Sequence, residues 1–298
     1  MNELRRGLAA TALFILLALA PAARAATGRA ECLSIHSKIL GRAVPYCALL
    51  PPSYDSDKAR RYPILYFLHG LGDNEQSFVR SGGWNLTEDL WEQGKLSEFL
   101  IVTPAGDASF YINSRDGHSR YEDFLLREFI PQIEGRYRTK AERAFRGIGG
   151  ISMGGYGALR LAFLHPELFV SVSAQGAALI EKLPEFTPDG SRRMGRLQIL
   201  GEIFGSPPDE AFWDRNNPLT FARKANLSGL KIYFDCGSED DFGFDAGAKV
   251  LDAILTKRHF AHEFHIYPGR HDWTYFASHL SEVLKFHAQA FGSTQKPK

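Results

Sequence analysis

Residues 144–165 read AFRGIGGISMGGYGALRLAFLH, and this stretch decides the fold. Its first part, Ala144 to Gly149, is a candidate buried strand, and its last part, Tyr156 to His165, is a helical run. Between them, Gly150-Ile151-Ser152-Met153-Gly154 matches G-x-S-x-G. Between a strand and a helix, this motif forms a sharp turn that exposes the serine hydroxyl at the head of the helix. The setting therefore predicts a nucleophilic Ser152, and a plain glycine turn is the alternative.

Strand-like and helix-like segments alternate on both sides of this turn. Short, largely apolar runs predict further strands at Pro63–Leu68, Phe99–Thr103, Phe169–Ser173, Leu230–Phe234 and Glu263–Tyr267. Helical stretches are expected at about Asp245–Arg258 and Tyr275–Ala290. Another helix is expected to start at the Ser119–Glu122 capping box, with Pro131 near its end. This alternation predicts an α/β fold with a mostly parallel central sheet and helices on both faces.

The chain has no internal repeat and no low-complexity linker, so we expect a single domain over residues 26–298. The stretch at about 175–228 interrupts the alternation with four prolines around one helical piece. Such an insertion between two core strands commonly forms a lid or one wall of a pocket.

The first 25 residues have the pattern of a secretory signal peptide. Arg5 and Arg6 precede an apolar run from about Leu8 to Ala20, and Ala23-Arg24-Ala25 is an A-x-A cleavage site. The run is short for a membrane-spanning helix, which needs about 20 apolar residues. We therefore expect a secreted or periplasmic protein without a stable membrane anchor. The formal net charge of +1 includes this segment, and no basic face indicates nucleic-acid binding.

Two of the three cysteines lie in a predicted antiparallel hairpin near the start of the mature chain. A turn centred on residues 39–40 would place Cys32 opposite Cys47, within disulfide reach, and an exported protein can form such a bond. A turn one residue later would pair Cys32 with Leu49 instead, so the bridge depends on the register. We expect Cys236 to be a small core residue.

A serine nucleophile needs a base later in the chain and an acid that orients the base. His271 follows a predicted strand and the turn Tyr267–Arg270, which places it at the carboxyl edge of the sheet. The loop after the Leu230–Phe234 strand carries four carboxylates, and three of them are expected to form an exposed acidic turn. We choose Asp240 as the acid, with Asp241 and then Glu239 as alternatives.

A cluster of three further histidines offers a competing site. His259, His262 and His265 could suggest a metal, but their spacing fits neither one helix face nor a familiar zinc pattern. We therefore expect no metal and no cofactor.

Acyl transfer through serine also requires donors for the oxyanion of the tetrahedral intermediate. The amide of Met153, directly after the nucleophile, is expected to be one donor. The loop His69-Gly70-Leu71-Gly72 follows an early strand, and we expect the amide of Leu71 to be the other.

Five segments together resemble one family. They are LHGLGD at 68–73, FYINSRDG at 110–117, GGISMGGYGALRLA at 149–162, DCGSED at 235–240 and YPGRHDW at 267–273. In this order they are similar to the Putative esterase (esterase D-like) family of α/β hydrolases, which includes S-formylglutathione hydrolases, tributyrin esterases, feruloyl esterases and mycolyltransferases. The likeness runs from about residue 32 to 291. It implies a Ser152–Asp240–His271 triad, oxyanion donors at Leu71 and Met153, and Trp84 near the pocket.

These observations together lead us to expect an exported serine carboxylic-ester hydrolase that acts on short-chain acyl or sugar-linked aromatic esters, with a small-molecule ester as its partner. The alternative is an acyltransferase that moves the acyl group to a carbohydrate or other alcohol. A binding protein on a hydrolase scaffold is a third reading, but such proteins usually lose a triad member.

Overall fold

The computed structural model describes residues 27–183 and 200–292. The predicted signal peptide and the central part of the predicted insertion lie outside the described residues. Within the described ranges, no helix combines the length and the apolar character needed to cross a membrane.

The described residues form one sheet of eight strands in the order β1-β2-β4-β3-β5-β6-β7-β8. The strands are β1 (Arg29–Ser37), β2 (Arg42–Leu50), β3 (Ile64–Leu68), β4 (Leu100–Pro104), β5 (Arg146–Ile151), β6 (Ser171–Gln175), β7 (Lys231–Gly237) and β8 (Glu263–Tyr267). β2 pairs antiparallel with β1 and β4, and all pairings from β4 to β8 are parallel. This arrangement confirms the α/β-hydrolase fold with an N-terminal antiparallel hairpin.

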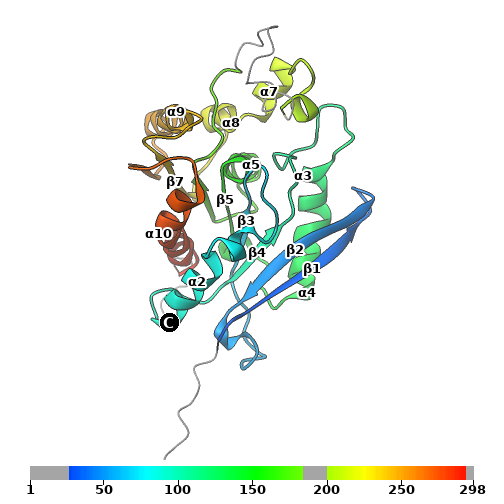
Figure 1. Ribbon diagram of the computed structural model, residues 1–298, viewed down its shortest axis with the longest axis vertical. Coiled ribbons are helices and arrows are strands. Elements are labelled where there is room, and N and C mark those ends of the chain that lie inside the picture. Colours follow the sequence, from blue (N-terminus) through cyan, green and yellow to red (C-terminus); the bar gives the residue numbers. More distant parts are fainter. Residues whose placement is uncertain (1–26, 184–199, 293–298) are drawn as a thin grey trace, which may run out of the picture.

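Helices cover both faces of the sheet. They are α1 (Ser77–Arg80), α2 (Gly83–Glu92), α3 (Tyr121–Phe124), α4 (Ile130–Arg136), α5 (Met153–Leu164), α7 (Glu210–Asn216), α8 (Pro218–Lys224), α9 (Phe244–Lys257) and α10 (Trp273–Gly292), with a π-turn at η2 (Leu125–Phe129) and short 3₁₀ turns at η1 (Pro52–Tyr54) and η3 (Arg143–Phe145). α2 and α10 pack on one face, and α3, α4, α5 and α9 pack on the other (Figure 1).

The central strands are buried on both faces, which explains why their sequences are continuously apolar. In β3, Ile64, Tyr66 and Leu68 join the core beneath α5, whereas Leu65 and Phe67 join the core beneath α2 and α10. A sheet covered on both sides has no polar face, so strict polar–apolar alternation is absent. Because the strands from β3 to β8 pair in parallel, the carboxyl ends of β3, β5, β7 and β8 lie at one edge of the sheet.

The N-terminal hairpin has the register that pairs the two cysteines. Cys32 lies opposite Cys47 with their Cα atoms 4.0 Å apart, and the two form a disulfide. The expected turn centred on residues 39–40 is therefore correct. Cys236 is buried and unbridged, as expected.

The predicted capping box at Ser119–Glu122 is wrong. α3 begins at Tyr121, its N-cap residue is Arg120, and no side chain caps it. Glu122 instead forms an ion pair with the buried Arg160 of α5. A buried arginine needs a carboxylate partner more strongly than a helix start needs a side-chain cap, since water can satisfy the exposed amides there.

The prediction that Pro131 lies near the end of this helix is also wrong. The helical path continues through η2 into α4 and ends at Arg136. Pro131 stands in the first turn of α4, directly after the π-turn. Proline lacks an amide hydrogen, and the altered hydrogen-bond spacing of a π-turn accommodates this loss without ending the helix.

Several predicted strands extend further toward their carboxyl ends in the structure. β5 runs to Ile151, β6 runs to Gln175 and β7 runs to Gly237, whereas β8 has the predicted bounds. The extra residues pair with the neighbouring strands at the edge where the loops with chemistry begin. The loops that carry Ser152, Asp240 and His271 begin at this edge.

Candidate active site

Ser152 occupies a strained turn between β5 and α5. Its backbone has φ 52° and ψ −116°, a conformation that non-glycine residues rarely adopt. A Cβ at Gly154 would lie 2.0 Å from the carbonyl oxygen of Leu68, and a Cβ at Gly150 would lie 2.6 Å from the same oxygen. The two glycines of the motif therefore let the turn pack directly against the end of β3, which holds Ser152 in its strained conformation.

The structure brings Ser152, His271 and Asp240 together from three separate loops. His271 Nε2 lies 2.9 Å from Ser152 Oγ, and His271 Nδ1 lies 2.7 Å from Asp240 Oδ2. These contacts form a continuous hydrogen-bond chain from the carboxylate through the imidazole to the hydroxyl. The Asp240 side chain is almost fully buried, whereas the Ser152 turn faces a cavity.

The neighbouring carboxylates have other partners. Asp241 forms an ion pair with Arg270 at the surface, and Glu239 is exposed. Asp240 accepts hydrogen bonds from the amides of Phe242 and Phe244 in addition to that from His271. Burial by itself would raise the pKa of Asp240, but these donors outweigh burial, and the pKa lies below its usual value. Asp240 is therefore charged at neutral pH and directed at the imidazole.

The prediction that Asp235, the first of the four carboxylates, lies in an exposed acidic turn is wrong. Asp235 lies within β7, is 1% exposed, and accepts a hydrogen bond of 2.7 Å from the hydroxyl of Tyr275. Burial raises its pKa to about 7. The strand runs past the predicted end at Phe234, so this residue belongs to the sheet rather than to the turn.

The two predicted oxyanion donors, Leu71 and Met153, both line the cavity beside Ser152. Met153 begins α5, so its amide is one of those that a helix start leaves without an intrahelical acceptor. Leu71 lies in the loop after β3, and its side chain lines the cavity beside Ser152. A Cβ at Gly70 would lie only 3.4 Å from the Ser152 Cβ, so the Leu71 loop is packed against the serine turn. The loops that carry both predicted donors therefore border the serine turn.

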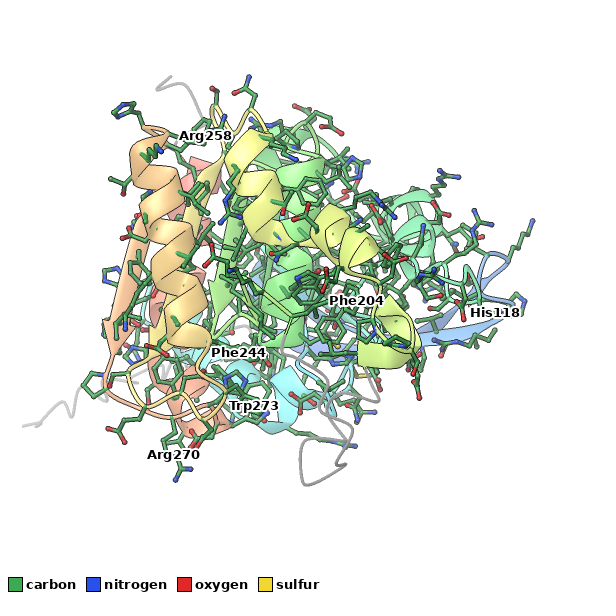
Figure 2. All side chains as sticks on the ribbon, turned by 90° about the horizontal axis from the view of Figure 1, so that it is seen from above. His118, Phe204, Phe244, Arg258, Arg270 and Trp273 are labelled. Carbon is green, nitrogen blue, oxygen red and sulfur yellow. A yellow bond between two sulfur atoms is a disulfide. The ribbon has the colours of Figure 1, made fainter. Side chains whose placement is uncertain are left out.

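A cavity of about 940 Å³ opens above these residues. Its walls are mainly apolar and include Phe110, Leu179, Trp213, Phe242, Phe244, Trp273 and Phe276. Phe244 and Trp273 lie near one another at the end of the molecule where α9 begins, and Arg270 extends outward there (Figure 2). A pocket of this size and character suits an organic ligand with an apolar part.

Trp84 is not among the residues that line this cavity. It packs in α2 against Trp91, with ring centroids 6.0 Å apart. Trp213 and Trp273 line the cavity instead, and the sequence analysis did not single them out. For Trp273 a signal existed, because it lies two residues after His271. For Trp213 none did, because it reaches the cavity through the packing of α7 against Tyr156 and Phe204.

Two of the three clustered histidines, His262 and His265, take part in separate contacts. His262 Nε2 lies 2.9 Å from Asp252, and its Nδ1 lies 2.8 Å from the carbonyl oxygen of Phe260. His265 packs against Tyr233 and Tyr267. In residues 27–183 and 200–292, no three His, Cys, Asp or Glu side chains are grouped so that they could hold a metal ion.

Comparison with known proteins finds esterases by family model, by sequence and by structure. A family model described as "Putative esterase" matches residues 37–287. An acetyl esterase of Caldicellulosiruptor saccharolyticus is 24% identical over 263 residues, which are 85% of this chain and 96% of that protein. An esterase of Mycobacterium tuberculosis is 31% identical over 75% of this chain, and the chain spans about half, 51%, of its length. The solved structure of a ferulic acid esterase superposes with a TM-score of 0.76 at 26% identity, covering 89% of this chain and 99% of that one.

Proposed function

The chain belongs to the Putative esterase family, and from that premise we propose that it is a serine carboxylesterase whose catalytic triad is Ser152, His271 and Asp240. The observation that carries the proposal is the pair of hydrogen bonds of 2.9 Å and 2.7 Å that joins these three side chains. They meet at the wall of an apolar cavity where an ester can approach the hydroxyl.

Each group has a defined role in the proposed reaction. Ser152 Oγ attacks the ester carbonyl carbon while His271 Nε2 takes its proton, and Asp240 stabilises the resulting imidazolium. The amides of Leu71 and Met153 donate to the oxyanion of the tetrahedral intermediate. His271 then protonates the alcohol, which leaves, and water hydrolyses the acyl-enzyme by the same steps.

The cavity has room for acyl groups from acetyl up to an aromatic acid. Its volume exceeds the space that an acetyl group needs, and aromatic rings form much of its wall. Among the relatives, one is named as an acetyl esterase and another as a ferulic acid esterase. We propose esters of short-chain or aromatic acids, including those linked to sugars, as the substrate class.

We also propose that the protein is exported and acts in the periplasm or outside the cell. The sequence of residues 1–25 has the signal-peptide pattern, and the Cys32–Cys47 disulfide is compatible with an oxidising compartment. N-terminal sequencing of protein recovered from each cell fraction tests this. A chain that begins at Ala26 outside the cytoplasm is expected, and an intact leader on a cytoplasmic protein would contradict it.

The first experiment measures hydrolysis of p-nitrophenyl esters from acetate to decanoate, together with a ferulate ester. We expect Ser152→Ala to lower kcat by at least about 10⁴-fold, because no other group forms the acyl-enzyme. Ser238→Ala is the matched control, since this serine is exposed on the Asp240 loop, and it should retain wild-type activity. Turnover that survives Ser152→Ala would disprove the mechanism.

The same assay with added alcohols or sugars distinguishes hydrolysis from acyl transfer. Free acid as the main product supports the esterase. A new ester that forms in proportion to the acceptor, at the expense of free acid, would show a transferase.

A further inference from the structure

His69 is a buried histidine that the mechanism above does not use. It directly follows β3 at the start of the Leu71 loop and is 4% exposed. Its Nδ1 lies 2.8 Å from the carbonyl oxygen of Gly70, and its Nε2 lies 2.7 Å from the amide nitrogen of Gly106. Both ring nitrogens therefore contact backbone groups of two different loops.

These two contacts fix the tautomer of the ring. The Gly106 amide can only donate, so Nε2 must be the unprotonated acceptor. The Gly70 carbonyl can only accept, so Nδ1 must carry the proton. Burial lowers the pKa of His69, which keeps the ring neutral and maintains this arrangement at neutral pH.

The Gly70 carbonyl and the Leu71 amide belong to the same peptide group. Because that group is planar and trans, its C=O and N–H point in opposite directions. The Gly70 oxygen is held by His69 Nδ1 and also accepts from the Asp73 amide at 3.2 Å. The Leu71 amide has no acceptor within residues 27–183 and 200–292. The bond from His69 thus sets the direction in which the Leu71 N–H points.

The loop that contacts the other ring nitrogen of His69 has a strained backbone. Asp107, Phe110 and Tyr111 all have positive φ values, between 47° and 58°. The Tyr111 hydroxyl donates to the His69 carbonyl at 3.1 Å. A Cβ at Gly106 would lie 2.4 Å from the Tyr111 ring, so the Gly106 backbone is closely packed there. Strain of this kind persists only where surrounding contacts hold the backbone, and it is typical of functional sites.

We propose that His69 is a positioning residue for the oxyanion hole. It connects the Gly106 loop to the Gly70–Leu71 peptide and so directs the Leu71 N–H at the oxyanion. The inference rests on the proposed function, because it requires acyl transfer through Ser152. His69 itself touches neither the substrate nor the reacting atoms. It acts by preventing rotation of one peptide group.

Two conservative variants separate the contacts of His69. In His69→Asn, the side-chain amide nitrogen can occupy the place of Nδ1 and donate to Gly70, but the contact with Gly106 is lost. In His69→Gln, the side-chain oxygen can occupy the place of Nε2 and accept from Gly106, but the donor to Gly70 is lost. His69→Phe removes both contacts and keeps a ring in the space.

We expect His69→Gln and His69→Phe to lower kcat by about 10- to 100-fold with KM unchanged, approaching the loss of one oxyanion donor. His69→Asn should lose at least about threefold less kcat than His69→Gln, because it keeps the bond to Gly70 and loses only the contact with Gly106. The inhibition constant of phenylboronic acid, which forms an anionic tetrahedral adduct with the serine, should rise in parallel with the loss of kcat. Thermal unfolding of each variant provides the fold control.

The outcomes distinguish this inference from the proposed function. If activity depends on Ser152 but His69→Asn and His69→Gln lose kcat equally, or if kcat follows thermal stability alone, the inference fails and the esterase stands. Raised KM with unchanged kcat and unchanged boronate affinity would also overturn it. Activity that does not depend on Ser152 would instead refute the proposed function.

Discussion

Among the described residues, two histidines form hydrogen bonds of nearly the same length with serine hydroxyls. At the edge of the sheet, His271 Nε2 lies 2.9 Å from Ser152 Oγ. In the interior, His287 of α10 has Nδ1 2.8 Å from Ser171 Oγ and Nε2 2.8 Å from Ser173 Oγ. The distances alone do not distinguish a candidate catalytic pair from a structural one.

The surroundings of the two histidines make the difference. His271 has a carboxylate on Nδ1 and a cavity beside its serine, whereas His287 is fully buried and has a serine hydroxyl on each nitrogen. Burial lowers the pKa of His287 to about 3, so it stays neutral and cannot serve as a base near pH 7. A carboxylate that orients the histidine and a cavity beside the serine therefore indicate catalysis, whereas the Ser–His contact by itself does not.

Removing the acid should have the largest effect on this comparison. We expect Asp240→Asn to lower kcat by about 10³–10⁴-fold, because the imidazole loses the partner that fixes its tautomer and stabilises its charge. Glu239→Gln is the matched control, since this exposed side chain lies on the same loop, and its kcat should change by no more than about threefold. Steady-state ester hydrolysis measures both. Equal losses in the two variants would mean that the acid has been misassigned.

Removing the interior histidine should affect stability rather than activity. His287→Ala leaves a cavity and two buried hydroxyls without their partner, so the free energy of unfolding should fall by about 3 kcal/mol. The folded variant should keep its kcat within about twofold. Urea denaturation and ester hydrolysis measure the two quantities, with the exposed Gln289→Ala on the same helix as the control. A large loss of kcat at full stability would remove the distinction between the two pairs.

Acid should weaken the fold through the interior pair. The unfolded imidazole of His287 takes up a proton near pH 6.5, but the folded one does so only near pH 3. Between these values the unfolded state binds more protons, so the contribution of His287 is complete above pH 6.5 and falls by about 1.4 kcal/mol per pH unit below it. Urea denaturation from pH 8 to pH 5 should show a steeper decline for wild type than for His287→Ala. Parallel curves would contradict the burial argument.

The local sequence was sufficient to predict the nucleophile turn, because the same short motif supplies the reactive serine and the glycines that its backbone needs. The G-x-S-x-G motif requires glycines on both sides of Ser152, and the structure shows a carbonyl oxygen in the place of the missing Cβ atoms. The β8 bounds also follow from short-range pattern, because a strand and its flanking turn lie within a few residues. The sequence left two hairpin registers open, and the structure has the one that pairs Cys32 with Cys47.

Other glycines of β5 could not be explained from the sequence. A Cβ at Gly147 would lie 2.8 Å from His287 Nδ1, and a Cβ at Gly149 would lie 3.3 Å from Nε2. These glycines make room for a ring that is about 140 residues away in the chain. The failed capping box has the same origin, since Glu122 is held by Arg160 on another helix.

The sequence by itself determined the α/β-hydrolase fold, the esterase family and the residues most suited to act as nucleophile, base and acid, because strand periodicity and motif order are local properties of the chain. Only the tertiary structure decided that Asp240 rather than Asp241 meets His271, that Trp273 rather than Trp84 lines the cavity, and that His69 holds the Leu71 peptide. These choices depend on which loops meet at the carboxyl edge of the sheet. Long-range packing decides which loops come together, and the residues of any single segment do not reveal it.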